Sequence, residues 1–141
     1  MAIKMRYLYF SGKKKIAALG QFIKNKYELS INSVDVIPPA YSCDKERIVL
    51  IAVSQKGSES PDALRLFLRE MTKVRAANTA VIIDGDQKAA DAICGYLREG
   101  GTNLVGDVLF FNGGNIFNSK LSDAETAAAC AWVDGIISSL A

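Results

Sequence analysis

The chain contains no histidine and only three cysteines, at positions 43, 94 and 130. Histidine-dependent catalytic triads and the common zinc sites are therefore excluded on composition. The cysteines are an odd number without C-x-x-C spacing, so no disulfide is implied. Cys94 and Cys130 fall within apolar helical patterns and are expected in the core, which leaves Cys43 as the candidate for an exposed thiol.

Long apolar runs and a strong charge of one sign are also missing. No apolar run approaches the roughly 18 residues that a membrane span needs, and the N-terminus carries no signal-peptide pattern, so we expect a cytoplasmic protein that does not bind membranes. Lys and Arg number 17 against 15 Asp and Glu, and the net charge of +2 does not indicate nucleic-acid binding. At 141 residues, half of them apolar, the chain is expected to form one domain over 1–141.

What the sequence does contain is an alternation of strand-like and helix-like segments. Strands are predicted over 5–10, 32–37, 48–53, 79–83 and 104–111. Helical patterns follow the first, third, fourth and fifth of these strands, which is typical of an α/β fold with a parallel sheet and helices on both faces.

The predicted helices also carry start signals. Ser60 is expected to cap the helix after the third strand, and Asp86 is expected to cap the helix after the fourth. Ser122 and Glu125 form a capping box that should open the last helix.

Two strand orders are common for a five-stranded doubly wound sheet, 2-1-3-4-5 and 3-2-1-4-5. The third strand, 48–53, is apolar at every position and belongs inside the sheet. Alternation in the second strand, and Gly106 and Asp107 in the fifth, indicate edges. We therefore expect the order 2-1-3-4-5, with ligands bound outside the carboxyl ends of the strands at the switch point between strands one and three.

Three turns are predicted to meet at this switch point. They comprise Ser11, Gly12, Lys13, Lys14, Lys15 and Ile16 after the first strand, Ser54, Gln55, Lys56 and Gly57 after the third, and Asp84, Gly85 and Asp86 after the fourth. Lysines are unfavourable at the positive end of a helix dipole, so three of them in a first turn suggest an anionic partner.

Simpler interpretations of the same residues stand beside this one. The lysines can be a solvated helix start, Ser11 and Gly12 a tight turn, and Gly57 an ordinary loop glycine. Asp86 is well placed as a helix cap, and two carboxylates, Asp84 and Asp86, are too few for a metal site.

The strand 7–10, the Ser11-Gly12 turn and the helix with Gly20 and Ile23 resemble the opening of the flavodoxin-like family, and the layout resembles it over essentially the whole chain. In that family a loop of the type Ser/Thr-x-Thr-Gly-x-Thr wraps the phosphate of FMN, and an aromatic residue of the second loop stacks on the isoalloxazine ring. The resemblance implies an FMN-binding protein that carries electrons to or from a redox partner protein and is not an enzyme in the strict sense.

The sequence departs from the family at each of these loops. Residues 13–16 are three lysines and an isoleucine where the family has hydroxyls and glycine, and Lys56 stands in the place of the stacking aromatic. The segment 84–86 carries no aromatic either, which leaves Tyr41 and Phe117, from other loops, as substitutes.

Two hypotheses follow from these departures. In the first, Ser11, the Gly12 amide and the lysines hold the FMN phosphate, and Lys56 stabilises the reduced flavin anion. In the second, flavin binding is lost and the fold binds another phosphorylated ligand or a protein partner.

Three other classes of protein with related folds are disfavoured. A phosphoacceptor receiver domain needs acidic residues where this chain has Ser11 and Ser54. The G-x-G-x-x-G fingerprint of Rossmann-type NAD binding is missing after the first strand. Cysteine phosphatase or arsenate reductase chemistry would need a cysteine in the first loop, and none is present there.

Overall fold

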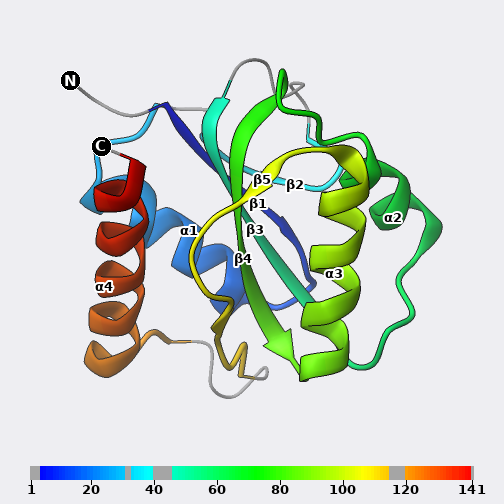
Figure 1. Ribbon diagram of the computed structural model, residues 1–141. Helices are drawn as coiled ribbons and strands as arrows, with labels where there is room; N and C mark the ends of the chain where they lie inside the picture. Colours follow the sequence, from blue (N-terminus) through cyan, green and yellow to red (C-terminus); the bar gives the residue numbers. More distant parts are fainter. Residues whose placement is uncertain (1–3, 31–32, 40–45, 115–119, 141) are drawn as a thin grey trace.

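The computed structural model describes residues 4–30, 33–39, 46–114 and 120–140. Over these ranges the protein is an α/β structure in which a parallel sheet lies between two pairs of helices (Figure 1). The elements in chain order are β1 (Met5–Phe10), α1 (Lys14–Lys26), β2 (Val34–Val36), β3 (Glu46–Gln55), α2 (Asp62–Arg69), β4 (Ala76–Gly85), α3 (Gln87–Gly100), β5 (Asn103–Leu104), β6 (Leu109–Phe110) and α4 (Asp123–Leu140).

The long strands β1, β3 and β4 form the centre of the sheet. β1 pairs with β2 on one side and with β3 on the other, and β3 pairs with β4, always in parallel. Residues 48–53 of β3 are all buried, which confirms the prediction that this strand lies inside the sheet. β5 and β6 both pair with β4 along its other side.

The prediction of one continuous strand over 104–111 is wrong. The segment forms two short strands, because Gly106 has a φ of 70°, which is incompatible with an extended strand. The indole N–H of Trp132 in α4 also donates to the carbonyl of Asp107 at 2.7 Å. This carbonyl therefore bonds to a helix, whereas in a continuous strand it would be available to a neighbouring strand. Pairing with β4 resumes at β6.

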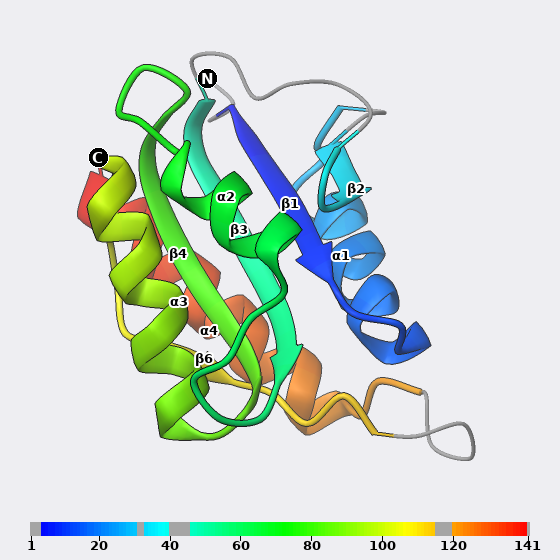
Figure 2. The same cartoon turned by 90° about the vertical axis from the view of Figure 1, so that its right-hand side faces the viewer.

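The core consists of two apolar layers, one on each face of the sheet. α2 and α3 cover one face, and α1 and α4 cover the other (Figure 2). In β3, Val49 and Ile51 face the first layer, whereas Ile48 and Leu50 face the second, because successive side chains of a strand point to opposite sides. Burying one such side chain stabilises the fold by about 1.5–3 kcal/mol.

Two of the three predicted helix caps are confirmed. The N–H of Glu125 donates to the Ser122 hydroxyl at 3.1 Å and the N–H of Ser122 donates to the Glu125 carboxylate at 3.0 Å, which is the expected capping box. Asp86 accepts a hydrogen bond from an N–H of the first turn of α3 at 3.0 Å. The prediction for Ser60 is wrong, because its hydroxyl donates to the side chain of Gln55 at 2.8 Å and α2 has no side-chain cap.

The two cysteines that the structure describes lie in helices. Cys94 is buried, as predicted, whereas Cys130 is half-buried. Cys43, Tyr41 and Phe117 lie outside the described residues, so the predictions for them stay untested.

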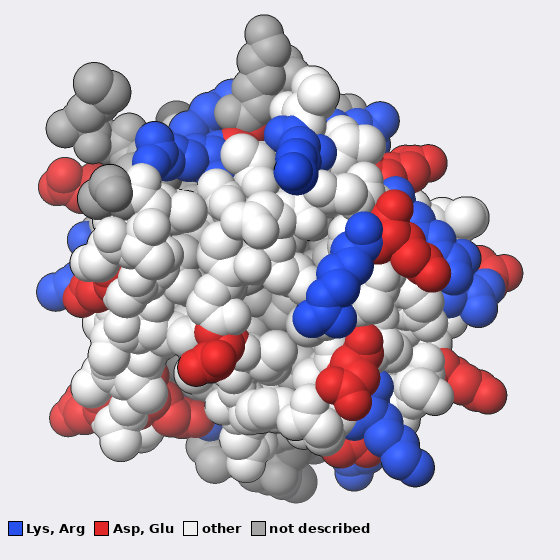
Figure 3. All heavy atoms as spheres, viewed as in Figure 1, with Lys and Arg blue, Asp and Glu red and all other residues white. Residues whose placement is uncertain are grey.

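Charged side chains of both signs are interspersed around the face shown in Figure 3. The middle of that face, where β5 and β6 run between α3 and α4, is largely uncharged (Figures 1 and 3). Among the described residues, no helix has the length and apolar character that crossing a bilayer requires.

Candidate functional site

The three predicted turns meet at the carboxyl edge of the sheet. β1 ends at Phe10 and α1 begins at Lys14, so the first turn is only three residues long. In the neighbouring strands, Ser54 lies in register with Asp84 near the ends of β3 and β4. The parallel arrangement places all of these groups at one edge, as the strand order predicts.

Four polar side chains from these turns form a continuous hydrogen-bonded network. Ser54 donates to a carboxylate oxygen of Asp84 at 2.8 Å, and the Lys13 ammonium donates to the same oxygen at 2.6 Å. The Ser11 and Ser54 hydroxyls lie 2.7 Å apart, and the Lys13 N–H donates to Ser11 at 3.0 Å. Because the only hydroxyl proton of Ser54 goes to Asp84, Ser11 is the donor to Ser54.

Asp84 is the acceptor at the centre of this network. Burial raises the pKa of Asp84, but hydrogen bonds from Lys13, the backbone of Gly113 and Ser54 outweigh burial, and the pKa lies below its ordinary value. The backbone of residue 113 can lie this close to the ion pair only because the residue is glycine. A Cβ there would lie 2.8 Å from Lys13 Cδ and 2.9 Å from Asp84 Cγ. The carboxylate is therefore charged at neutral pH and held between β4 and the segment after β6.

The other lysines of the first turn differ from one another. Lys14 is exposed, and the first turn of α1 contains no acidic residue and no side-chain cap. Lys15 is buried and forms an ion pair with Glu125 of α4 at 2.6 Å, with its ammonium 5.4 Å from the centre of the Phe111 ring. Ile16 is fully buried in the core. Lys15 and Ile16 therefore pack within the fold, and neither side chain is available to an anion at the first turn.

The second and third turns are tied to each other by Asp86. The N–H of Gly57 donates to both carboxylate oxygens of Asp86, at 3.0 and 3.2 Å, and Gly57 has a φ of 75°, a conformation that favours glycine. Gln55 donates to the Gly57 carbonyl at 2.9 Å. Hydrogen bonds from the backbone of Ala89 and then of Gly57 hold the pKa of Asp86 below its ordinary value. These residues order the two turns and leave Lys56 exposed at their tip.

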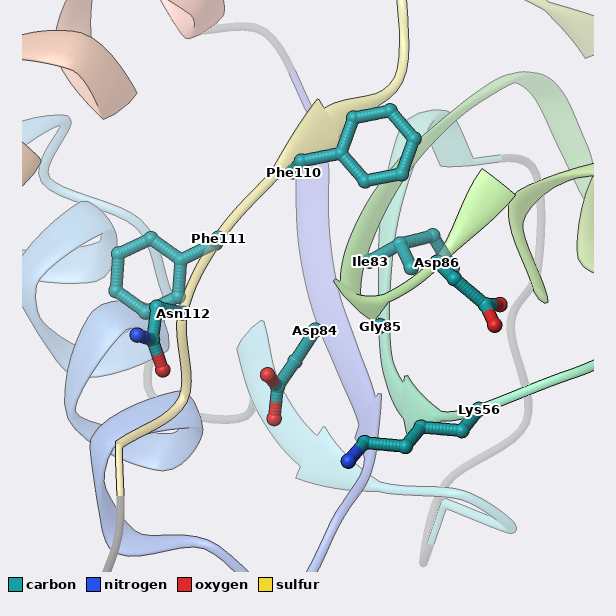
Figure 4. Close-up of a pocket in the computed structure, with 8 residues that line it drawn as sticks. All are labelled: Lys56, Ile83, Asp84, Gly85, Asp86, Phe110, Phe111 and Asn112. Atoms are coloured by element: carbon teal, nitrogen blue, oxygen red, sulfur yellow. The ribbon is translucent and has the colours of Figure 1, made fainter. Parts of the chain in front are cut away.

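An open cavity of about 600 Å³ lies beside these turns (Figure 4). Its lining comprises Lys56, Ile83, Asp84, Gly85, Asp86, Phe110, Phe111 and Asn112. The Lys56 side chain extends along the cavity with its ammonium on the side of Asp84, and Phe110 and Phe111 point to opposite sides of β6 (Figure 4). Phe110 is 49% exposed, so its ring is an apolar surface available to a ligand.

Phe110 is the residue that the sequence analysis missed. The sequence places Phe110 in the fifth strand and offers Tyr41 and Phe117 as aromatic partners for a ring. The position of Phe110 at the end of its strand could have indicated this role. The last residues of a parallel strand lie at the same edge of the sheet as the turns that follow the neighbouring strands.

A second cavity, of about 380 Å³, lies next to the first turn on the side of β2. It is lined by Tyr9, Phe10, Ser11, Gly12, Lys13, Val36, Ile37 and Ser54. The polar network therefore borders both cavities: Asp84 lines the first, and Ser11, Lys13 and Ser54 line the second.

No family model matches the chain, and neither a curated protein nor a solved structure matches it. Within the ranges that the structure describes, no group of three or more His, Cys, Asp and Glu side chains is placed to hold a metal ion. The site offers hydrogen-bond donors and ammonium groups at the first turn and an aromatic surface at β6. These are groups that can bind an anion and a planar ring, respectively.

Proposed function

We propose that the protein binds FMN at the carboxyl edge of its sheet and acts in the cytoplasm as a flavodoxin-like electron carrier for a redox partner protein. The proposal counts β5 and β6 as one fifth strand, because both pair with β4. The sheet then has the flavodoxin-like order 2-1-3-4-5. The observation that carries the proposal is the 600 Å³ cavity, whose lining includes the exposed Phe110 ring, Lys56 and Asp84. Asp84 in turn bonds to Lys13, the residue that precedes α1.

The residues of the site fit the two ends of FMN. The N–H of the exposed residue Gly12 and the ammonium groups of Lys13 and Lys14 would hold the phosphate, because charge-assisted donors and the positive end of a helix favour an anion. The Phe110 ring would contact the isoalloxazine, and Lys56 would offer a positive charge beside it. Bound FMN would supply one- and two-electron transfer, while these side chains bind and orient it.

A second candidate function is a module without flavin that binds another phosphorylated ligand or a protein partner. The ion pair between Lys13 and Asp84 favours it, because this lysine already has an anionic partner within the chain. Of the six positions 11–16 that correspond to the phosphate loop of the resembled family, the last three already belong to α1.

Titration of FMN into the purified protein tests both candidates. We expect quenching of flavin fluorescence at micromolar concentrations and a rise in melting temperature with added FMN, because a ligand that binds only the folded state stabilises it. An unchanged flavin signal at tens of micromolar FMN would exclude the electron carrier. A thermal-shift screen of phosphorylated metabolites would then test the second candidate.

Replacing Lys13 and Lys14 together by alanine should weaken FMN roughly tenfold and leave riboflavin within about twofold, because only FMN carries the phosphate. Fluorescence titration with both flavins measures the ratio. The matched control is Lys24→Ala with Lys26→Ala, which removes the same number of charges from the last turn of α1. Equal losses for FMN and riboflavin would contradict the phosphate role of the two lysines.

A further inference from the structure

The Lys13–Asp84 ion pair lies inside the proposed anion site. The Asp84 side chain is 11% exposed and the Lys13 side chain 43% exposed, so the carboxylate is the more buried partner. Ser11, at the start of the first turn, is connected to Asp84 through one intervening hydroxyl, that of Ser54. An anion bound at this turn would therefore lie close to the carboxylate and would share the Lys13 ammonium with it.

The position of Asp84 is built into the fold. Its carboxylate oxygen accepts hydrogen bonds from Ser54 and Lys13, and Gly113 packs against it so closely that a Cβ would lie 2.9 Å from Asp84 Cγ. Lys13, by contrast, is the residue that precedes α1, and its exposed side chain carries the ammonium group on a flexible stem. Of the two partners, Lys13 is the one that can turn to a ligand, and Asp84 stays in place.

We propose that Asp84 is an internal competitor that weakens anion binding at the first turn, in proportion to the charge of the ligand. A ligand anion must draw Lys13 away from Asp84 and accept repulsion from a fixed carboxylate nearby. A dianionic phosphate meets twice the repulsion that a monoanion does, and a neutral ligand meets none. The inference rests on the proposed function for the location of the ligand, but not for its identity as FMN.

The variant Asp84→Asn tests the inference with inorganic phosphate as the probe. Asparagine keeps an acceptor for Ser54 and removes the charge, so phosphate should bind roughly fivefold more tightly than to the wild type, the factor expected for a partly exposed ion pair. Amide chemical shifts of residues 11–14, followed by NMR at constant ionic strength, report binding and also show that the variant is folded. In a Lys13→Ala background the same substitution should bring a smaller gain, because only the direct repulsion by Asp84 is then removed.

Asp107→Asn is the matched control, because it removes one negative charge at an exposed position in the segment between β5 and β6. Its phosphate affinity should equal that of the wild type. Equal affinities of Asp84→Asn and the wild type would overturn the inference, and so would an equal gain in Asp107→Asn. Failure of phosphate to bind either protein at tens of millimolar would overturn it as well.

Parallel titrations with FMN and riboflavin separate this inference from the proposed function. We expect Asp84→Asn to increase the preference for FMN over riboflavin, again roughly fivefold. If Asp84→Asn gains phosphate affinity while neither protein binds FMN, the electron-carrier proposal fails and the competitor role of Asp84 stands. If both proteins bind FMN with the same affinity and phosphate binding is unchanged, the competitor role fails and the electron-carrier proposal stands.

Discussion

Replacing Gly85 by alanine is expected to lower the free energy of unfolding by about 2–4 kcal/mol. Gly85 is the last residue of β4 and lies in register with Gln55 of β3. A Cβ at Gly85 would overlap the carbonyl oxygen of Gln55 and lie 2.9 Å from its carbonyl carbon. The obstacle is backbone, which cannot turn aside as a side chain can, so the two strand ends must separate.

Urea denaturation followed by circular dichroism measures this effect. Gly95→Ala is the control, because Gly95 lies in α3 and an added Cβ would point into open space, so alanine should stabilise the protein by about 0.5–1 kcal/mol. The two substitutions add the same methyl group and are expected to have opposite signs. A change below about 1 kcal/mol for Gly85→Ala would show that the ends of β3 and β4 are not packed as described.

The second large effect is expected for Glu125→Gln. The Lys15 side chain is 4% exposed, so its ammonium depends on the Glu125 carboxylate, which itself is 24% exposed. Glutamine has nearly the same shape and can still accept the hydrogen bond from the N–H of Ser122, but it then turns its amide donors toward Lys15. Leaving a buried charge without its partner should cost about 3 kcal/mol, the lower end of the usual range, because Glu125 is partly exposed.

This loss should depend on pH. The hydrogen bond from Lys15 outweighs the effect of burial and holds the pKa of Glu125 below its ordinary value. The stabilisation from Glu125 is therefore fully present above the pKa of the unfolded chain, about 4.3, and is lost as the pH falls through the lower pKa of the folded protein. The difference in unfolding free energy between wild type and Glu125→Gln should be largest near neutral pH and should shrink below about pH 4.

Two variants make the interpretation specific. Asp123→Asn removes another carboxylate from the first turn of α4 and should cost less than about 1 kcal/mol, because that group is exposed. Adding Lys15→Met to Glu125→Gln should restore part of the lost stability, because it removes the unpaired charge. If Glu125→Gln costs no more than Asp123→Asn, the ion pair does not stabilise the fold.

Local signals predicted the elements of this protein well where one interaction dominates. The apolar run at 48–53 placed its strand inside the sheet, because only a strand covered on both faces can bury every side chain. The spacing of Ser122 and Glu125 located the start of α4, because a capping box is formed within four residues.

Predictions failed where an interaction outside the local pattern competes for the same group. Ser60 has the position of a helix cap, but its hydroxyl bonds to Gln55. The segment 104–111 has the composition of a strand, but Gly106 turns the chain and Trp132 of α4 bonds to it. Trp132 lies 25 positions from Asp107, and the bond between Ser60 and Gln55, five positions apart, depends on how the loop between them folds.

The sequence by itself determined most of the strands and helices, which strand lies inside, and that the turn at 11–13 stands at the carboxyl edge. Hydrophobic periodicity and local capping decide those features, and both are written within a few residues. Only the tertiary structure decided the partners of the lysines. Lys13 meets Asp84 from 71 positions away, and Lys15 meets Glu125 of the last helix. Such pairings depend on strand register and helix placement over the whole fold, so three adjacent lysines received three different environments.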